Sequence, residues 1–177
     1  RRATVEALRD EVGRAGDEIA RASAVLTLLE ARADQVGRGS DADDEPPAER
    51  AFRRYLQGPD RPGSLSYLTA ATVRLDDGET TAFDAAREPA TSAVDGFVRD
   101  FSTYVGGGAV DATTLADDFG ALCTDGTAED LRALVSLFEH VVAAARGFRD
   151  DRRAALNGDV GGQTGALQTF LDGLDDE

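Results

Sequence analysis

The stretch that decides the fold is VEALRDEVGRAGDEIARASAVLTLLEARADQV, residues 5–36. Its apolar residues recur at alternating spacings of three and four without a miss. They form a seam of ten positions: Val5, Leu8, Val12, Ala15, Ile19, Ala22, Leu26, Leu29, Ala33 and Val36. A heptad repeat of this kind predicts one long helix over about residues 3–37 whose apolar stripe faces a partner helix, as in a coiled coil.

The residues beside the seam carry charge, which is typical of coiled-coil flanks. With Val5 at heptad position a, charged residues fall at e and g: Arg9, Glu11, Glu18, Glu30 and Arg32. Three alanines in the seam and two glycines, Gly13 and Gly16, weaken the pattern. An ordinary amphipathic helix lying on its own domain therefore remains the alternative. The larger seam residues form the predicted interface: Val5, Leu8, Val12, Ile19, Leu26, Leu29 and Val36.

A second long helix is predicted over about residues 128–156. Thr127 followed by Asp130 resembles a capping box, and the apolar spacing of three and four continues from Leu131. Asn157-Gly158 is a typical stop signal, and a short C-terminal helix is expected after Gly161-Gly162. We expect a mainly α fold in which these two long helices pack antiparallel.

Shorter elements are predicted between the long helices. Alternating apolar residues around Asp77-Gly78 predict a small β-hairpin over about residues 66–84, with a helix over 65–75 as the alternative. Three short helices are expected over about 47–57, 89–105 and 111–122, and Asp111 is expected to cap the last of them. The predicted organisation is a coiled-coil-like helix at 1–37, an acidic linker at 38–48 and a helical domain with the hairpin at 49–177.

The charge composition indicates where the protein works. The chain has 34 acidic residues, no lysine and a net charge of −15, and all 19 of its basic residues are arginine. An acidic surface stays hydrated in molar salt, where screening suppresses its self-repulsion. We therefore expect a halophilic, haloarchaeal protein located in the cytoplasm. The charge opposes nonspecific nucleic-acid binding, and no apolar run is long enough to span a membrane.

Residues able to carry chemistry are few. Cys123 is the single cysteine and His140 the single histidine. We predict a buried packing role for Cys123 and a solvent-facing position for His140. The many acidic pairs follow from the composition and lack the spacing of a calcium loop. We therefore predict no catalytic residue, no cofactor and no metal site.

The leading hypothesis is a non-enzymatic protein that forms a homo-oligomer or binds a protein partner through its first helix. Two alternatives stay open. Long N- and C-terminal helices flanking a hairpin resemble prefoldin subunits in outline, which implies a chaperone-like scaffold. The other is a small ligand-binding regulator or an enzyme that uses Cys123 and His140. Its pocket would lie between the 89–105 helix and the hairpin, near Tyr67, Phe97 and Tyr104.

Overall fold

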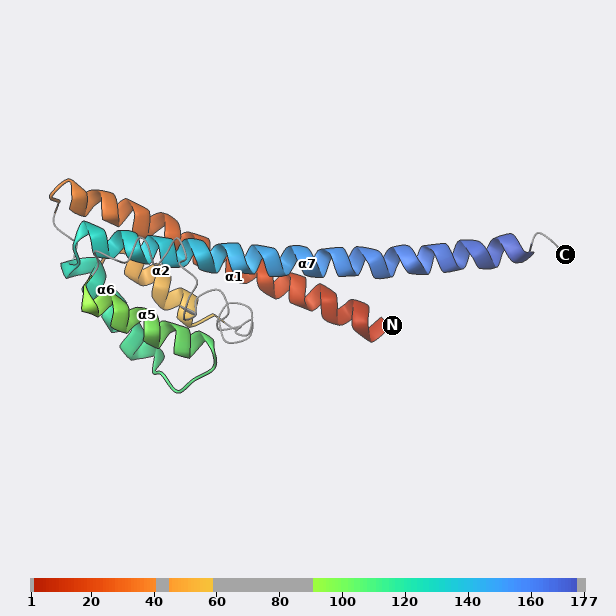
Figure 1. The fold of residues 1–177 in the computed structure, drawn as a ribbon, viewed down its shortest axis with the longest axis horizontal. Helices are drawn as coiled ribbons and strands as arrows, with labels where there is room; N and C mark the ends of the chain where they lie inside the picture. The colour runs from red at the N-terminus through yellow and green to blue at the C-terminus, as the bar shows by residue number, and fades with distance from the viewer. Residues whose placement is uncertain (1, 41–44, 59–90, 175–177) are drawn as a thin grey trace.

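The computed structural model describes residues 2–40, 45–58 and 91–174, and these residues are mainly helical, as predicted (Figure 1). The helices follow in the order α1 (Arg2–Gly37), α2 (Pro47–Leu56), α5 (Ser92–Val105), α6 (Ala112–Asp125) and α7 (Ala128–Leu174). The described residues contain no β-strand. The predicted hairpin at about 66–84 lies outside them.

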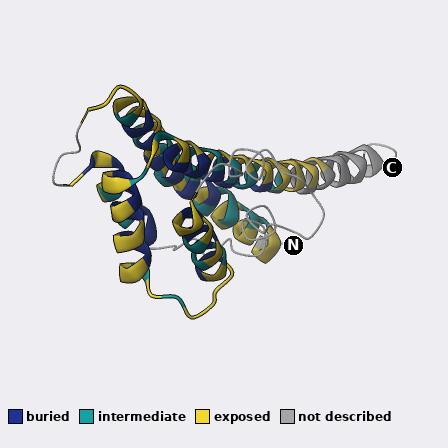
Figure 2. Cartoon of the chain, turned by 60° about the vertical axis from the view of Figure 1, so that its left-hand side comes forward, coloured by how far each residue is buried: buried dark blue, intermediate teal, exposed yellow. Residues whose placement is uncertain are grey.

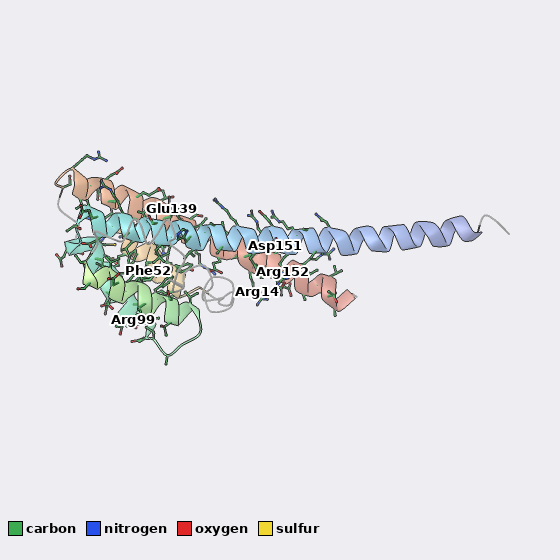
Figure 3. All side chains as sticks on the ribbon, in the orientation of Figure 1. Arg14, Phe52, Arg99, Glu139, Asp151 and Arg152 are labelled. Carbon is green, nitrogen blue, oxygen red and sulfur yellow. The ribbon has the colours of Figure 1, made fainter. Side chains whose placement is uncertain are left out.

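Helix α1 makes its most extensive contact with α7, and the two helices run in opposite directions (Figure 1). Ala15 packs on Phe148, and Arg152 Nε lies 2.8 Å from Glu11 Oε2. The Arg152 guanidinium also lies over the Phe148 ring, 4.8 Å from its centroid. Figure 3 shows Arg152 where α1 passes beside α7. This contact joins the N-terminal half of α1 to the middle of α7.

The predicted end of the second long helix at about residue 156 is wrong. Helix α7 is continuous from Ala128 to Leu174, so the expected separate C-terminal helix is part of it. An Asn-Gly pair ends a helix when the glycine adopts a positive φ. Among the described residues, Gly39 and Gly107 have a positive φ and Gly158 does not. A glycine costs a helix only about 1 kcal/mol relative to alanine, so it does not stop the helix by itself.

The core is built around aromatic rings contributed by four helices. The Phe52 ring of α2 lies 4.2 Å from the Phe119 ring of α6, centroid to centroid, in a stacked arrangement. It also lies 5.7 Å from Phe97 and 5.9 Å from both Phe101 and Phe138. All five phenylalanines are buried, which Figure 2 shows as the dark inner faces of the helices. This cluster joins α2, α5, α6 and α7.

Helix α1 belongs to the same core as the other helices. Its buried residues Ala22, Val25, Leu29 and Ala33 join the cluster that contains the aromatic rings. Helix α2 begins at Pro47, inside the predicted linker of residues 38–48, because proline suits the first turn of a helix. The first helix and the following helices therefore share one apolar interior.

Short-range hydrogen bonds set the starts of the later helices. Asp111 accepts a hydrogen bond from the Thr113 N–H at 3.1 Å and caps α6, as predicted. The predicted capping box of α7 is also confirmed, since Asp130 N–H donates to Thr127 Oγ1 and Thr127 N–H donates back to Asp130 Oδ2. Helix α5 starts at Ser92, later than expected, because the preceding Thr91 N–H donates to Asp130 Oδ1 at 2.9 Å.

Candidate functional site

The buried face of α1 overlaps the predicted a/d seam and extends beyond it on the side of the g positions. The d positions Ala15, Ala22 and Leu29 are buried, as the seam predicts. The g positions are buried as well, at Glu18, Val25 and Arg32. Four of the five a positions therefore lie along the edge of the contact with the rest of the protein, and the fifth, Ala33, is buried. The four are half-buried: Val5, Val12, Ile19 and Leu26.

Two long-range hydrogen bonds account for the burial of charged residues at the g positions. The Tyr55 hydroxyl donates to Glu18 Oε1 at 3.2 Å, and Arg32 Nε donates to the Cys123 carbonyl oxygen at 2.8 Å. Burial and the Glu18 carboxylate both raise the pKa of Tyr55 well above its usual value, so its hydroxyl stays protonated and can donate. Charged residues at g are normally solvated. The sequence signal that could have revealed this burial at the g positions is Val25, an apolar residue at g.

The seven predicted interface residues occupy three environments. Leu29 is fully buried in the core, and Leu26 and Val36 are partly buried against it. The remaining four are half-buried and lie outside both core clusters: Val5, Leu8, Val12 and Ile19. We call these four residues the α1 edge strip. They are the part of the predicted interface that lies outside the described core clusters.

Helix α7 continues well beyond the N-terminal end of α1, and no other described helix lies beside this overhang (Figure 1). Because Glu11 meets Arg152 and Ala15 meets Phe148, the first residue of α1 falls at about the level of residue 161 of α7. The remaining 13 residues to Leu174 would span about 20 Å at 1.5 Å per residue. The part of the edge strip from Val5 to Val12 thus lies toward the end of the molecule that carries the overhang, and Ile19 lies at the middle of α1.

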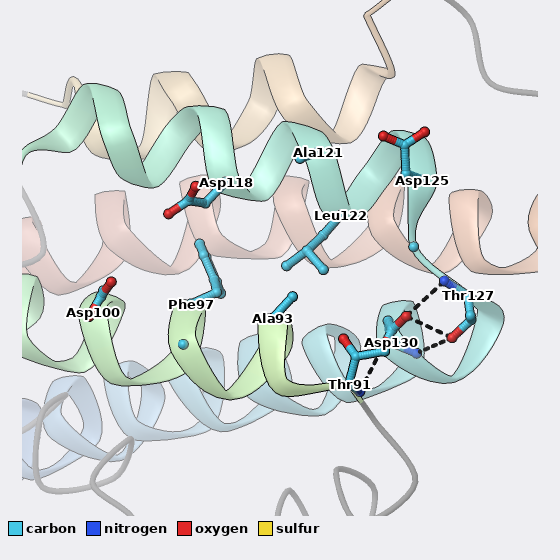
Figure 4. Close-up of a pocket in the computed structure, with 12 residues that line it drawn as sticks. Thr91, Ala93, Phe97, Asp100, Asp118, Ala121, Leu122, Asp125, Thr127 and Asp130 are labelled. Atoms are coloured by element: carbon cyan, nitrogen blue, oxygen red, sulfur yellow. Dashed lines mark hydrogen bonds between the residues drawn. The ribbon is translucent and has the colours of Figure 1, made fainter.

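A groove of about 490 Å³ lies between α5 and α6 (Figure 4). Phe97 and Leu122 line it, and the carboxylates of Asp100, Asp118 and Asp125 lie around it. Phe97 lines this groove, whereas the pocket predicted for it lies between the 89–105 helix and the hairpin, which is outside the described residues. In this acidic chain the three carboxylates alone do not define a binding chemistry.

Tyr104 is buried in the core, where its hydroxyl donates to the Leu56 carbonyl oxygen at 3.4 Å. Its ring faces α2 and does not line this groove, and the predicted pocket beside the hairpin stays a prediction. Tyr67 lies outside the described residues.

Cys123 is fully buried, as predicted, and His140 is half-buried on α7 rather than solvent-facing. Burial raises the pKa of the Cys123 thiol to about 12; the Glu49 carboxylate adds to the rise, and the Arg32 guanidinium opposes it. A thiol with this pKa is protonated near neutral pH and is a poor nucleophile. Within the described residues, no group of three His, Cys, Asp or Glu side chains could hold a metal ion.

The chain matches no protein-family model, and no curated protein or solved structure is similar to it. Among the helices of the described residues, none is both long and apolar enough to cross a membrane.

Proposed function

We propose that the protein is a non-enzymatic assembly protein that pairs, in the manner of a coiled coil, through the α1 edge strip and the α7 overhang. The observation that supports this most directly is the edge strip itself. Four large apolar residues stay half-buried along one side of α1, outside the core clusters. A helix laid against the strip would remove this apolar surface from water, which stabilises association.

The composition of the overhang supports the same proposal. Beyond Asn157, α7 contains glycines at positions 158, 161, 162, 165 and 173. Each costs an unsupported helix about 1 kcal/mol relative to alanine, and isolated helices of about 12–15 residues are already marginal in water. A second helix alongside would offset that cost. A second copy of this chain carries the same strip and overhang, so self-association is the first form to test.

The test measures mass by light scattering in about 2 M KCl, where the acidic surface is well screened. We expect the wild type to exceed the 18.6 kDa of one chain, and Val12→Asp or Ile19→Asp to return the mass to that of the monomer. Circular dichroism checks that each variant keeps its helices. Thr27→Asp is the matched control, because it places the same charge at an exposed position of α1.

A wild type that remains monomeric at high concentration contradicts self-association. A mass that falls equally for Thr27→Asp contradicts the role of the strip. If the wild type is monomeric, a partner helix from another protein at the strip is the remaining form of the proposal. It would be tested by comparing the binding of wild type and Ile19→Asp to that protein.

We also propose the kind of organism and the compartment in which this protein works. The absence of lysine and the net charge of −15 favour a halophilic, haloarchaeal cytoplasm as the setting. The chaperone-like scaffold is a second form of the proposal, in which the edge strip binds an unfolded protein.

The α5–α6 groove favours a second candidate function, a small-ligand regulator that binds at Phe97. Its test is a thermal-shift screen in which Ala93→Trp, at the exposed edge of the groove, abolishes any stabilisation by a ligand.

A further inference from the structure

A second groove, of about 530 Å³, lies between α1 and α2, away from the edge strip. Its floor is made of small and apolar residues from both helices: Ala20, Ala24 and Leu28 of α1, and Pro47 and Ala51 of α2. From Ala20 to Leu28 the groove follows α1 for about 12 Å, or roughly two helical turns. The small side chains allow another backbone to approach both helices closely.

Every charged residue that lines this groove is an arginine: Arg21, Arg50 and Arg54. This is unusual in a chain with 34 acidic residues and 19 basic ones. Arg50 and Arg54 are exposed and one turn apart on α2, and no carboxylate of the described residues lies within ion-pair distance of either. The groove is therefore positively charged on a strongly negative molecule.

The third arginine of α2 faces the opposite way. Arg53 Nη2 lies 2.7 Å from Glu49 Oε1 and 2.9 Å from Asp117 Oδ1 of α6. Its charge is thus neutralised within the fold. Helix α2 directs one arginine to an internal ion-pair network and the other two to the groove.

We propose that the α1–α2 groove docks an acidic amphipathic helix of a partner protein. Two carboxylates one turn apart on that helix would pair with Arg50 and Arg54, and its small or apolar residues would lie on the alanine floor. Helices commonly bind in apolar grooves through residues spaced by three or four positions. Guanidinium groups suit carboxylates because their fork of donors matches the two carboxylate oxygens.

The same features disfavour other anions. A nucleic acid would meet few cations here and a net charge of −15 around them. A single phosphate would use the arginines but not the apolar floor, which extends over two helical turns. A helix uses both the charge and the length of the groove.

The experiment measures binding of the whole chain to a fluorescein-labelled synthetic helical peptide by fluorescence polarisation, in about 0.15 M KCl, with circular dichroism at the same salt concentration to check that the chain keeps its helices. The peptide has about four turns, with alanine and leucine on one face and two glutamates one turn apart beside them. Two control peptides carry glutamine or lysine in place of the glutamates. We expect the glutamate peptide to bind about tenfold more tightly than the glutamine peptide.

Variants of the protein make the test specific. The double variant Arg50→Glu/Arg54→Glu should bind the glutamate peptide about tenfold more weakly and should gain affinity for the lysine peptide. Arg132→Glu, exposed on α7 and outside the groove, is the matched control and should leave binding unchanged. Ile19→Asp should also leave it unchanged, which separates this surface from the edge strip.

Three results would overturn the proposal. One is equal binding, or no binding, of the glutamate and glutamine peptides. Another is an unchanged affinity in the double variant. The third is displacement of the peptide by millimolar inorganic phosphate or by a short single-stranded oligonucleotide, which would indicate a simple anion site.

Discussion

The Asp130 side chain should stabilise the protein more than any other carboxylate near a helix start. It is buried and accepts three hydrogen bonds: from Thr91 N–H at 2.9 Å, Thr127 N–H at 2.8 Å and Thr127 Oγ1 at 2.8 Å. It thereby ties the beginning of α7 to the beginning of α5. We expect Asp130→Asn to remove this link, because an amide keeps one acceptor oxygen and turns a donor toward the other N–H groups.

The magnitude follows from the bonds lost. A hydrogen bond to a charged group contributes about 1.5–3 kcal/mol, and a buried donor left without a partner adds to the loss. Loss of one such bond and weakening of the others should lower the free energy of unfolding by about 3 kcal/mol. For a chain of this size that corresponds to a fall in Tm of about 10 °C. Thermal unfolding followed by circular dichroism in about 2 M KCl measures it.

The matched control is Glu129→Gln. Glu129 is exposed in the same first turn of α7, so its removal deletes one charge near the helix dipole and no hydrogen bond among the described residues. We expect a loss of at most about 1 kcal/mol. If Asp130→Asn lowers Tm no more than Glu129→Gln does, the hydrogen-bond argument is refuted.

The ionisation of Asp130 should make the stabilisation by its side chain depend on pH. Burial opposes ionisation of Asp130, but the hydrogen bonds from Thr91 and Thr127 outweigh it and lower its pKa. A carboxyl group with a lowered pKa in the folded state stabilises the protein above its unfolded pKa of about 3.9. That stabilisation is lost as the pH falls through the pKa of Asp130 in the folded state. The Tm difference between wild type and Asp130→Asn should therefore be constant above about pH 5 and shrink in stronger acid.

Three further predictions concern the core and the helices. Phe52→Ala, at the centre of the ring cluster, should lower the free energy of unfolding by about 3–5 kcal/mol in urea titrations. Gly126→Ala should destabilise the protein because the added Cβ would collide with the Leu122 carbonyl oxygen. Gly147→Ala, which has open space around it on α7, should stabilise the protein by about 0.5–1 kcal/mol. Equal shifts in Tm for the two variants would contradict this reasoning. Because Cys123 is buried with a pKa of about 12, labelling by a disulfide reagent at pH 8 should be slow in the native state and fast in urea, and rapid native labelling would refute this.

Local signals predicted the helices well where the interaction is itself local. The caps at Asp111 and at Thr127 with Asp130 join residues two or three positions apart, so the spacing in the chain nearly determines the hydrogen bond. The bounds of α1 follow in the same way from a stripe of apolar residues repeated every three or four positions. The end of α7 was predicted poorly, because Asn157-Gly158 permits a stop but does not require one.

The side of α1 that is buried was decided by contacts between distant parts of the chain. Glu18 meets Tyr55, 37 residues away, and Arg32 meets the Cys123 carbonyl, 91 residues away. A charged group can leave water only when a partner satisfies its hydrogen bonds, and no spacing within α1 reveals that partner. The heptad stripe thus established that α1 is a long amphipathic helix. The tertiary structure decided which side is most buried: it buries the d and g positions between Ala15 and Arg32 and leaves the edge strip half-buried.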